Sequence, residues 1–297
     1  MKKNSHILSL FVISVIWGGG CIMIKQALND GMDARILNVY RGLIFTVLVL
    51  ATNAKNVLKM KKDTFIWGSV AGFFSFVSFL TQSIGQQYTT PAKAGFYVGT
   101  GVIMIPFIVW AVRKIRPQAS HIVSAVVCLF GMMILSGFIK GDISFNFGDA
   151  LIVAAAGFYA VSLTIMSNMP KDAHYSQSAF CMAYTLFLGS FIYSVINLGS
   201  VSAILTSKVS LIPLLYLAVL SNFVAQTMQV KAARFVHPYI VSLITSTEGI
   251  FGAIFSILLG FEALDPAVVV GGLIIFLSLV ISEMDFAKIK RIMLKTV

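Results

Sequence analysis

The sequence is poor in charged residues. Only 11% of its 297 residues are Asp, Glu, Lys or Arg, while 58% are apolar. A soluble globular domain carries about a quarter charged residues. Because so few charges cannot cover the surface of a water-soluble globule of this length, we expect lipid to surround most of the chain.

Side chains that bind metals or carry out catalysis are also scarce, and they lie far apart. The three cysteines lie within apolar segments, and the four histidines lie near the ends of such segments. A metal site requires clustered ligands, and a disulfide framework requires exposed cysteine pairs. The sequence contains no HExxH motif, nucleophile elbow or Walker motif. We therefore expect no metal site, no cofactor, no ATP-driven pumping and no enzymatic activity.

Long apolar segments occupy the space between the charges. A helix needs about 20 mostly apolar residues to cross the hydrocarbon core, and ten segments meet this requirement. Short connections rich in Gly and Pro join them, and no connection is long enough to form a soluble domain. We expect an all-α membrane protein with ten transmembrane helices. The segments run near 6–28, 35–53, 64–86, 92–112, 119–138, 148–167, 178–198, 209–231, 239–260 and 264–284.

The positive charges favour one orientation in the membrane. They occur in short clusters between the apolar segments, which argues against a nucleic-acid partner. With the amino terminus inside, 16 of the 22 Lys and Arg residues lie on the inner side and four on the outer side, while Lys25 and Arg41 lie within helices. The positive-inside rule therefore predicts a multi-pass protein of the inner or plasma membrane with both termini cytoplasmic. The four outer residues are Arg35, Lys93, Lys140 and Lys208.

The second half of the sequence repeats polar and proline positions of the first half. Residues 64–140 align with 211–287 at a shift of 147. Polar residues are costly in lipid, so coincident polar positions are informative. We interpret 1–140 and 141–297 as two five-helix repeats, the second with a short basic cytoplasmic tail. Five is odd, so the second copy is inverted, as in secondary transporters that bind substrate between the copies. The alignment pairs Ser75 with Asn222, Gln82 with Gln229, Pro91 with Pro238, and Thr100 with Thr247.

Two of the expected helices carry polar stripes at helical spacing. In segment 64–86 the spacings are 3, 4 and 4 residues, which place the polar side chains on one face. Side-chain amides both donate and accept hydrogen bonds, so a cavity lined by both stripes would suit a zwitterion or a hydroxylated metabolite. The alternative is that these groups join helices by hydrogen bonds. The stripes consist of Ser75, Ser78, Gln82 and Gln86 in one segment and Asn222, Gln226 and Gln229 in the other.

Four charged residues within or beside the helices are candidate functional groups. Glu248 lies near the middle of segment 239–260, where an unpaired carboxylate is expensive and commonly functional. It could take a proton, bind a substrate amine or pair with Arg41. Lys25 and Glu262 lie near the outer ends of their helices, so we expect a gating or helix-end role for both.

Three aromatic residues complete the candidate cavity. Trp17 and Tyr159 occupy matching places in the two repeats when the first segment is aligned with the sixth. Matched aromatic rings between the repeats are plausible walls for a shared cavity. We also place Tyr97 in this set.

Several short motifs follow one another along nearly the whole chain in a characteristic order and spacing. They are Ile16-Trp17-Gly18-Gly19 with Lys25, Tyr40-Arg41, Tyr88–Phe96, Ser246–Ala253 and Leu259–Leu264. Together they resemble the EamA-type branch of the drug/metabolite transporter superfamily. Gly249 stands where that family often has proline, and Phe261 replaces a usual glycine. The resemblance implies ten helices, alternating access, and transport of amino acids or related metabolites, without naming the substrate.

These observations favour a secondary transporter that exports an amino acid or related compound, as a monomer or a homodimer. A nucleotide-sugar or phosphate-ester carrier stays open, because Lys25, Arg41 and Lys93 could meet an anion. A multidrug carrier for cations would favour a carboxylate in the first helix, and that helix has none. From a different class, an intramembrane enzyme or lipid flippase would need a catalytic pair or a lateral opening, and no such pair is visible.

Overall fold

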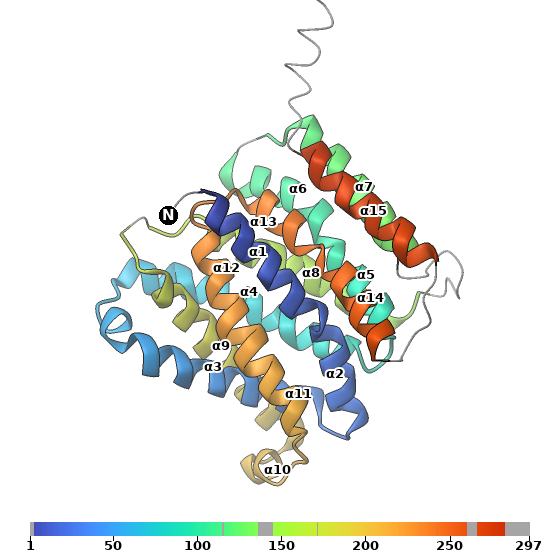
Figure 1. The fold of residues 1–297 in the computed structure, drawn as a ribbon. Helices are drawn as coiled ribbons and strands as arrows, with labels where there is room; N and C mark the ends of the chain where they lie inside the picture. The colour runs from blue at the N-terminus through green and yellow to red at the C-terminus, as the bar shows by residue number, and fades with distance from the viewer. Residues whose placement is uncertain (1–2, 115, 136–144, 171, 260–265, 283–297) are drawn as a thin grey trace, which may run out of the picture.

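The described part of the chain is helical throughout. The computed structural model describes residues 3–114, 116–135, 145–170, 172–259 and 266–282, and within these ranges it contains no β-strand (Figure 1). The first half forms α1 (Lys3–Gly18), α2 (Gly20–Asn29), α3 (Ala34–Val57), α4 (Lys62–Gly85), α5 (Pro91–Gly99), α6 (Gly101–Arg113) and α7 (Ala119–Leu135). The second half forms α8 (Phe147–Met166), α9 (Tyr175–Leu198), α10 (Val201–Leu205), α11 (Leu211–Leu215), the π-helix η1 (Tyr216–Gln226), α12 (Thr227–Ala232), α13 (Pro238–Thr245), α14 (Glu248–Leu258) and α15 (Pro266–Ser282).

The predicted segments correspond to helical stretches of membrane-spanning character. Eight stretches of the described chain are long and apolar enough to cross a membrane. The fifth and tenth predicted segments correspond to α7 and α15, which are shorter apolar helices of 17 residues each. An all-α membrane fold is therefore confirmed, with eight full-length spans and two shorter apolar helices among the described residues.

Polar side chains cap several of the helices. Asp33 accepts a hydrogen bond from a backbone N–H at the start of α3, and Thr90 does the same at the start of α5. Asn146 forms a reciprocal capping pair with Asp149 at the start of α8. Each cap satisfies a backbone N–H group that the first turn of a helix leaves without a partner.

Three of the spans are interrupted near their middles. One span breaks between α1 and α2 at Gly19, and another breaks between α5 and α6 at Thr100. The third breaks between α13 and α14, where the N–H of Thr247 donates to the carbonyl of Ile244 three residues earlier. Thr100 and Thr247, the residues aligned at the shift of 147, therefore both lie at helix breaks. The sequence predicts one continuous helix for each of the segments 6–28, 92–112 and 239–260, and each is two helices.

Helices from the two halves pack against one another. The long helices α3 and α9 lie together, α4 packs against both α8 and α9, and α7 packs against α15. Figure 1 shows α7 and α15 side by side along one edge of the molecule. A β-carbon on Gly131 of α7 would lie 2.9 Å from the carbonyl oxygen of Gly271 in α15, so this contact requires glycine.

Contacts between loops define two ends of the molecule. At one end Lys61 pairs with Asp172 at 2.5 Å, and the side chain of Gln177 donates to the carbonyl of Asn56. We call it the basic end, because its described Lys and Arg residues outnumber those of the opposite end. The basic end carries Lys55, Lys59, Lys61, Lys62, Arg113, Lys114, Arg116, Lys231 and Arg234, and the opposite end carries Lys25, Arg35, Lys93 and Lys208.

Candidate functional site

A cavity lies where the interrupted spans meet. It holds about 150 Å³ that the centre of a water molecule can reach. Both halves of the chain contribute its walls: α1 to α7 from the first, and α8, η1, α13 and α14 from the second. Broken helices expose backbone and polar groups that continuous helices keep paired, which is why cavities of this kind form at such breaks.

Glu248 is the carboxylate of the cavity wall. It is the first residue of α14 and follows the break at Thr247. Among the described residues, no hydrogen bond or ion pair is formed by its carboxylate, and Arg41 lies beyond ion-pairing distance. The pairing of Glu248 with Arg41 that the sequence suggested is therefore absent from this conformation. Burying an ion without a partner is expensive, so the position marks Glu248 as a functional candidate.

Arg41 is the cation of the same cavity wall. Its side chain is 1% exposed, and it lies on α3. Its Nη2 donates to Oδ1 of Asn222 at 2.8 Å, and its Nη1 lies 3.4 Å from Oδ1 of Asn38. The guanidinium also lies over the ring of Phe79, 5.1 Å from the ring centre. All these partners are neutral, so Arg41 presents its full charge at the cavity wall.

Two aromatic rings from opposite halves form part of the wall. Trp17 and Tyr159 meet edge to face with their ring centres 6.0 Å apart. The indole Nε1 of Trp17 donates to the carbonyl of Ser221 in η1 at 3.2 Å. The hydroxyl of Tyr159 donates to the carboxamide oxygens of Gln226 and Gln229. Hydrogen bonds therefore hold both rings in place, and both residues line the cavity.

The predicted polar stripes divide between the cavity and the helix contacts. Ser78 and Gln82 of α4 line the cavity, but Gln229 does not. Gln229 instead accepts a hydrogen bond from Tyr159, which does line the cavity, so the expectation that Gln82 and Gln229 face one void is wrong for Gln229. The other predicted residues outside the lining are Ser75, Gln86, Tyr97, Asn222 and Gln226, all of them buried.

Lys25 joins two elements at the end opposite the basic one. Its Nζ donates to the carbonyl oxygens of Gln86 and Thr89, both at 3.0 Å. These carbonyls belong to the end of α4 and the loop that follows it, so Lys25 connects α2 to that loop. Carbonyls at a helix end lack partners within the helix, and a lysine is a suitable donor for them. Glu262, the other predicted helix-end residue, lies outside the described residues.

Two residues that line the cavity, Phe79 and Cys21, were not predicted from the sequence. Phe79 is three residues before Gln82 and therefore lies on the face of the predicted stripe, so helical spacing could have placed it there. Cys21 also lines the cavity, but in the sequence it is one small residue in an apolar run. Among the described residues, no group of three or more His, Cys, Asp or Glu side chains could hold a metal ion.

The part of α1 that precedes the cavity residue Trp17 is packed inside the protein. Below Trp17, the side chains of Leu10, Ile13 and Ser14 on α1 are fully buried. The hydroxyl of Ser14 donates to the carbonyl of Ile244 at 3.0 Å, which joins α1 to α13. A hydrogen bond therefore joins the first half of α1 to α13 in this conformation.

Comparisons with known proteins agree with this geometry. An uncharacterized transporter of Archaeoglobus fulgidus is 27% identical over 281 residues, which cover 95% of this chain and 86% of that protein. A protein of known crystal structure shares the fold with a TM-score of 0.72 at 14% identity, covering 95% of this chain and 97% of that one. The model of the EamA-like transporter family matches residues 4–137 and 146–284. The chain is thus a multi-pass membrane protein and belongs to the EamA-like transporter family.

Proposed function

We propose that this protein is a secondary transporter that moves a small polar metabolite across the cell membrane by alternating access. The observation that carries the proposal is a central cavity whose wall bears two opposite charges that are not paired with each other, Arg41 and Glu248. Charges are retained inside a membrane protein mainly where they contact substrates or ions. Membership in the EamA-like family supports the same function.

The two halves act as inverted repeats in this proposal. Three observations support it. The family model matches two consecutive segments, which lie within 1–140 and 141–297. Equivalent helices of the two halves pack against each other, α3 with α9 and α7 with α15. Thr100 and Thr247 interrupt equivalent spans. In such an architecture one repeat rocks against the other around a central site, which opens the two ends in turn.

The chemistry of the cavity favours an amino acid or a related compound. A guanidinium suits a carboxylate, and a carboxylate suits an ammonium group. Trp17, Phe79 and Tyr159 supply apolar surface for the rest of the molecule. A phosphate ester fits less well, because Glu248 would repel its two negative charges. We propose export as the direction, with the basic end in the cytoplasm.

A ligand screen followed by a flux measurement tests this function. The purified protein is heated with a panel of amino acids, sugars, nucleotides and quaternary amines, because a ligand that binds only the folded state raises the melting temperature. Compounds that stabilise the protein are then tested for counterflow in proteoliposomes. We expect saturable stabilisation and saturable counterflow for one class of polar metabolite. Stabilisation without any counterflow, or no stabilisation by any compound, would contradict the proposal.

A further inference from the structure

Arg41 is held entirely by neutral groups, although it is buried in a membrane protein. The oxygens nearest its two Nη atoms belong to the carboxamides of Asn222 and Asn38. No Asp or Glu side chain lies within ion-pairing distance of Arg41 among the described residues. Burying a guanidinium without a counter-ion costs free energy, so a purely structural role would favour a carboxylate partner at this position.

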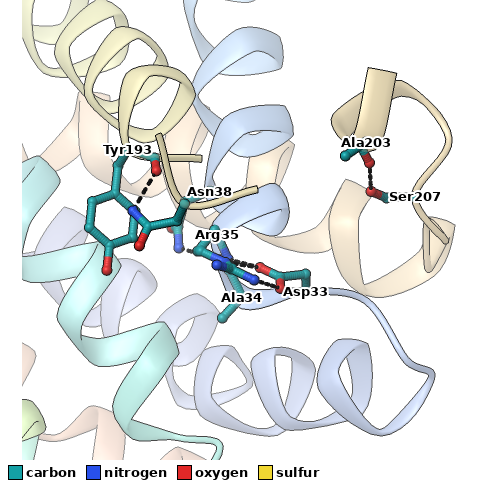
Figure 2. A network of polar contacts seen from close by, with 8 residues as sticks. Asp33, Ala34, Arg35, Asn38, Tyr193, Ala203 and Ser207 are labelled. Carbon is teal, nitrogen blue, oxygen red and sulfur yellow. Dashed lines mark hydrogen bonds and ion pairs between the residues drawn. The ribbon is translucent and has the colours of Figure 1, made fainter. Parts of the chain in front are cut away.

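The carboxamide of Asn38 is oriented by a backbone contact. Its Nδ2 donates to the carbonyl of Ala34 one turn earlier at 2.9 Å, which leaves Oδ1 as the atom that faces Arg41. Figure 2 shows this first turn of α3, where Asp33 also binds the backbone and the guanidinium of Arg35. The acid at this helix start is therefore committed to Arg35. The nearest acidic side chain in the sequence is thereby directed away from Arg41.

Two buried donors at the contact have no partner. Among the described residues, neither Nε of Arg41 nor Nδ2 of Asn222 has a hydrogen-bond partner, and both atoms are buried. Arg41 is 1% exposed, Asn222 is 0% exposed, and Arg41 lines the cavity. A buried donor without a partner costs about 1–3 kcal/mol. Both donors lie beside an uncompensated positive charge, and Arg41 itself lines the cavity, so these surroundings favour an anion.

We propose that the Arg41 guanidinium is an anion subsite of the transport cavity and takes the carboxylate of the transported molecule. Asn222 and Asn38 are positioning residues: they orient the guanidinium with neutral oxygens and leave its charge for the ligand. An aspartate at either position would occupy the guanidinium permanently. The proposal rests on the transport function above and adds the group through which the ligand is recognised.

The test replaces each positioning asparagine by aspartate, which has the same shape and one added negative charge. Asn222→Asp and Asn38→Asp place that charge beside Arg41. Asn197→Asp is the matched control, because Asn197 is exposed and bonds only the carbonyl of Tyr193 in its own helix. The probes are L-amino acids, each paired with its carboxamide, which keeps the ammonium group and the side chain but lacks the carboxylate. Sodium chloride against sodium gluconate tests for a free inorganic anion.

The proposal predicts two quantities for each variant: its preference for an acid over the matching amide, and its melting temperature without ligand. The wild type and Asn197→Asp should bind an acid at least about tenfold more tightly than its amide, a difference of about 1.4 kcal/mol. Asn222→Asp and Asn38→Asp should lose this preference. The ligand-free melting temperature of Asn222→Asp should stay equal to the wild type or rise, because Arg41 gains a carboxylate, whereas Asn38→Asp also loses the hydrogen bond to the carbonyl of Ala34. Two aspartate variants are used so that, if one folds poorly, the other still tests whether the acid preference is lost.

Three outcomes would overturn the inference. Equal binding of acid and amide by the wild type would do so, as would an unchanged preference in both aspartate variants. Chloride-dependent stabilisation that Asn222→Asp abolishes, without any acid preference, would assign the subsite to an inorganic anion instead. Counterflow of the broader metabolite panel separates this result from failure of the transport function: flux without acid preference refutes only the subsite, and no flux for any compound refutes the transporter.

Discussion

At the scale of single residues, Glu248 and Arg41 contact the same cavity from different helices without meeting. Glu248 begins α14, while Arg41 lies on α3 and is held by Asn222. Because no ion pair joins them, the carboxylate of Glu248 remains available to a proton, to a substrate amine or to a cation. In each of these three roles transport depends on the carboxylate. The stability of the fold does not depend on it in any of them.

Glu248→Gln should therefore separate transport from folding. We expect gradient-driven transport to fall at least about tenfold, or about 1.4 kcal/mol, with a melting temperature equal to that of the wild type, because the substitution removes no ion pair. Proteoliposome uptake and thermal melting of the same preparation provide the two measurements. Exchange without a gradient should survive if Glu248 carries a proton, and should be lost if it binds substrate.

The control for this substitution is Asp172→Asn, which neutralises an acid in the exposed pair with Lys61. It should transport like the wild type, since exposed ion pairs contribute about 0–1 kcal/mol. Wild-type uptake by Glu248→Gln would show that the carboxylate is a tolerated polar group, and a large loss of stability would show that it pairs with a cation in the folded state.

At the scale of elements, the close contact of α1 with α14 requires a glycine at position 18. A β-carbon on Gly18 would lie 2.6 Å from Cβ of Phe251 and 2.8 Å from the backbone nitrogen of Gly252. Both atoms belong to α14 near Glu248, and backbone atoms cannot move aside independently. Two residues further on, a β-carbon on Gly20 would meet no atom within 4 Å. On the same interrupted span, Gly18 is therefore tightly packed, whereas Gly20 has space for a larger side chain.

Gly18→Ala should destabilise the protein, and Gly20→Ala should not. Overpacking of this kind costs about 1–3 kcal/mol, because the two helices must separate. Replacing Gly20 adds helix propensity in open space, so we expect a melting temperature equal to or above the wild type. Thermal melting of the two variants side by side checks this prediction, and equal melting temperatures would show that α1 and α14 are not held in this close contact.

The elements also show where sequence patterns were sufficient. The spans were located from apolar length alone, since lipid demands about 20 apolar residues from any helix that crosses it. The apolar pattern did not predict the interruptions at Gly19, Thr100 and Thr247. A tight turn of three residues leaves apolar residues on both sides, so the hydropathy pattern continues through the break. Because the cavity forms at these breaks, the hydropathy pattern could not predict it.

At the scale of the whole molecule, the distribution of charge predicts the orientation. The described loops of the basic end lie together, as the contact of Lys61 with Asp172 shows, and Lys25, Arg35, Lys93 and Lys208 lie at the other end. Lys and Arg are retained on the cytoplasmic side during insertion. A reporter enzyme that is active only outside the membrane should be inactive when fused after Val297 and active when inserted beside Lys208. The reverse pattern would invert the proposed topology.

The sequence by itself determined that lipid surrounds this protein, where its spans lie and which family it belongs to. The lipid environment and the spans follow from composition and length, because a bilayer imposes the same requirements on every segment that crosses it, whereas the family follows from the order and spacing of short motifs. The polar residues of the stripes were identified as important, and only part of them lines the cavity. Ser78 and Gln82 face it, while Gln229 instead accepts a hydrogen bond from Tyr159.

Only the tertiary structure decided which polar side chain meets the cavity and which meets a neighbouring helix. Each residue turns the helix by about 100°, so one stripe can face two different surroundings along its length. The neighbours across the interface come from distant parts of the chain: Arg41 meets Asn222, and Tyr159 meets Gln229. Sequence spacing describes one helix at a time, whereas the partner of a buried charge is set by how separate helices rotate and pack against each other.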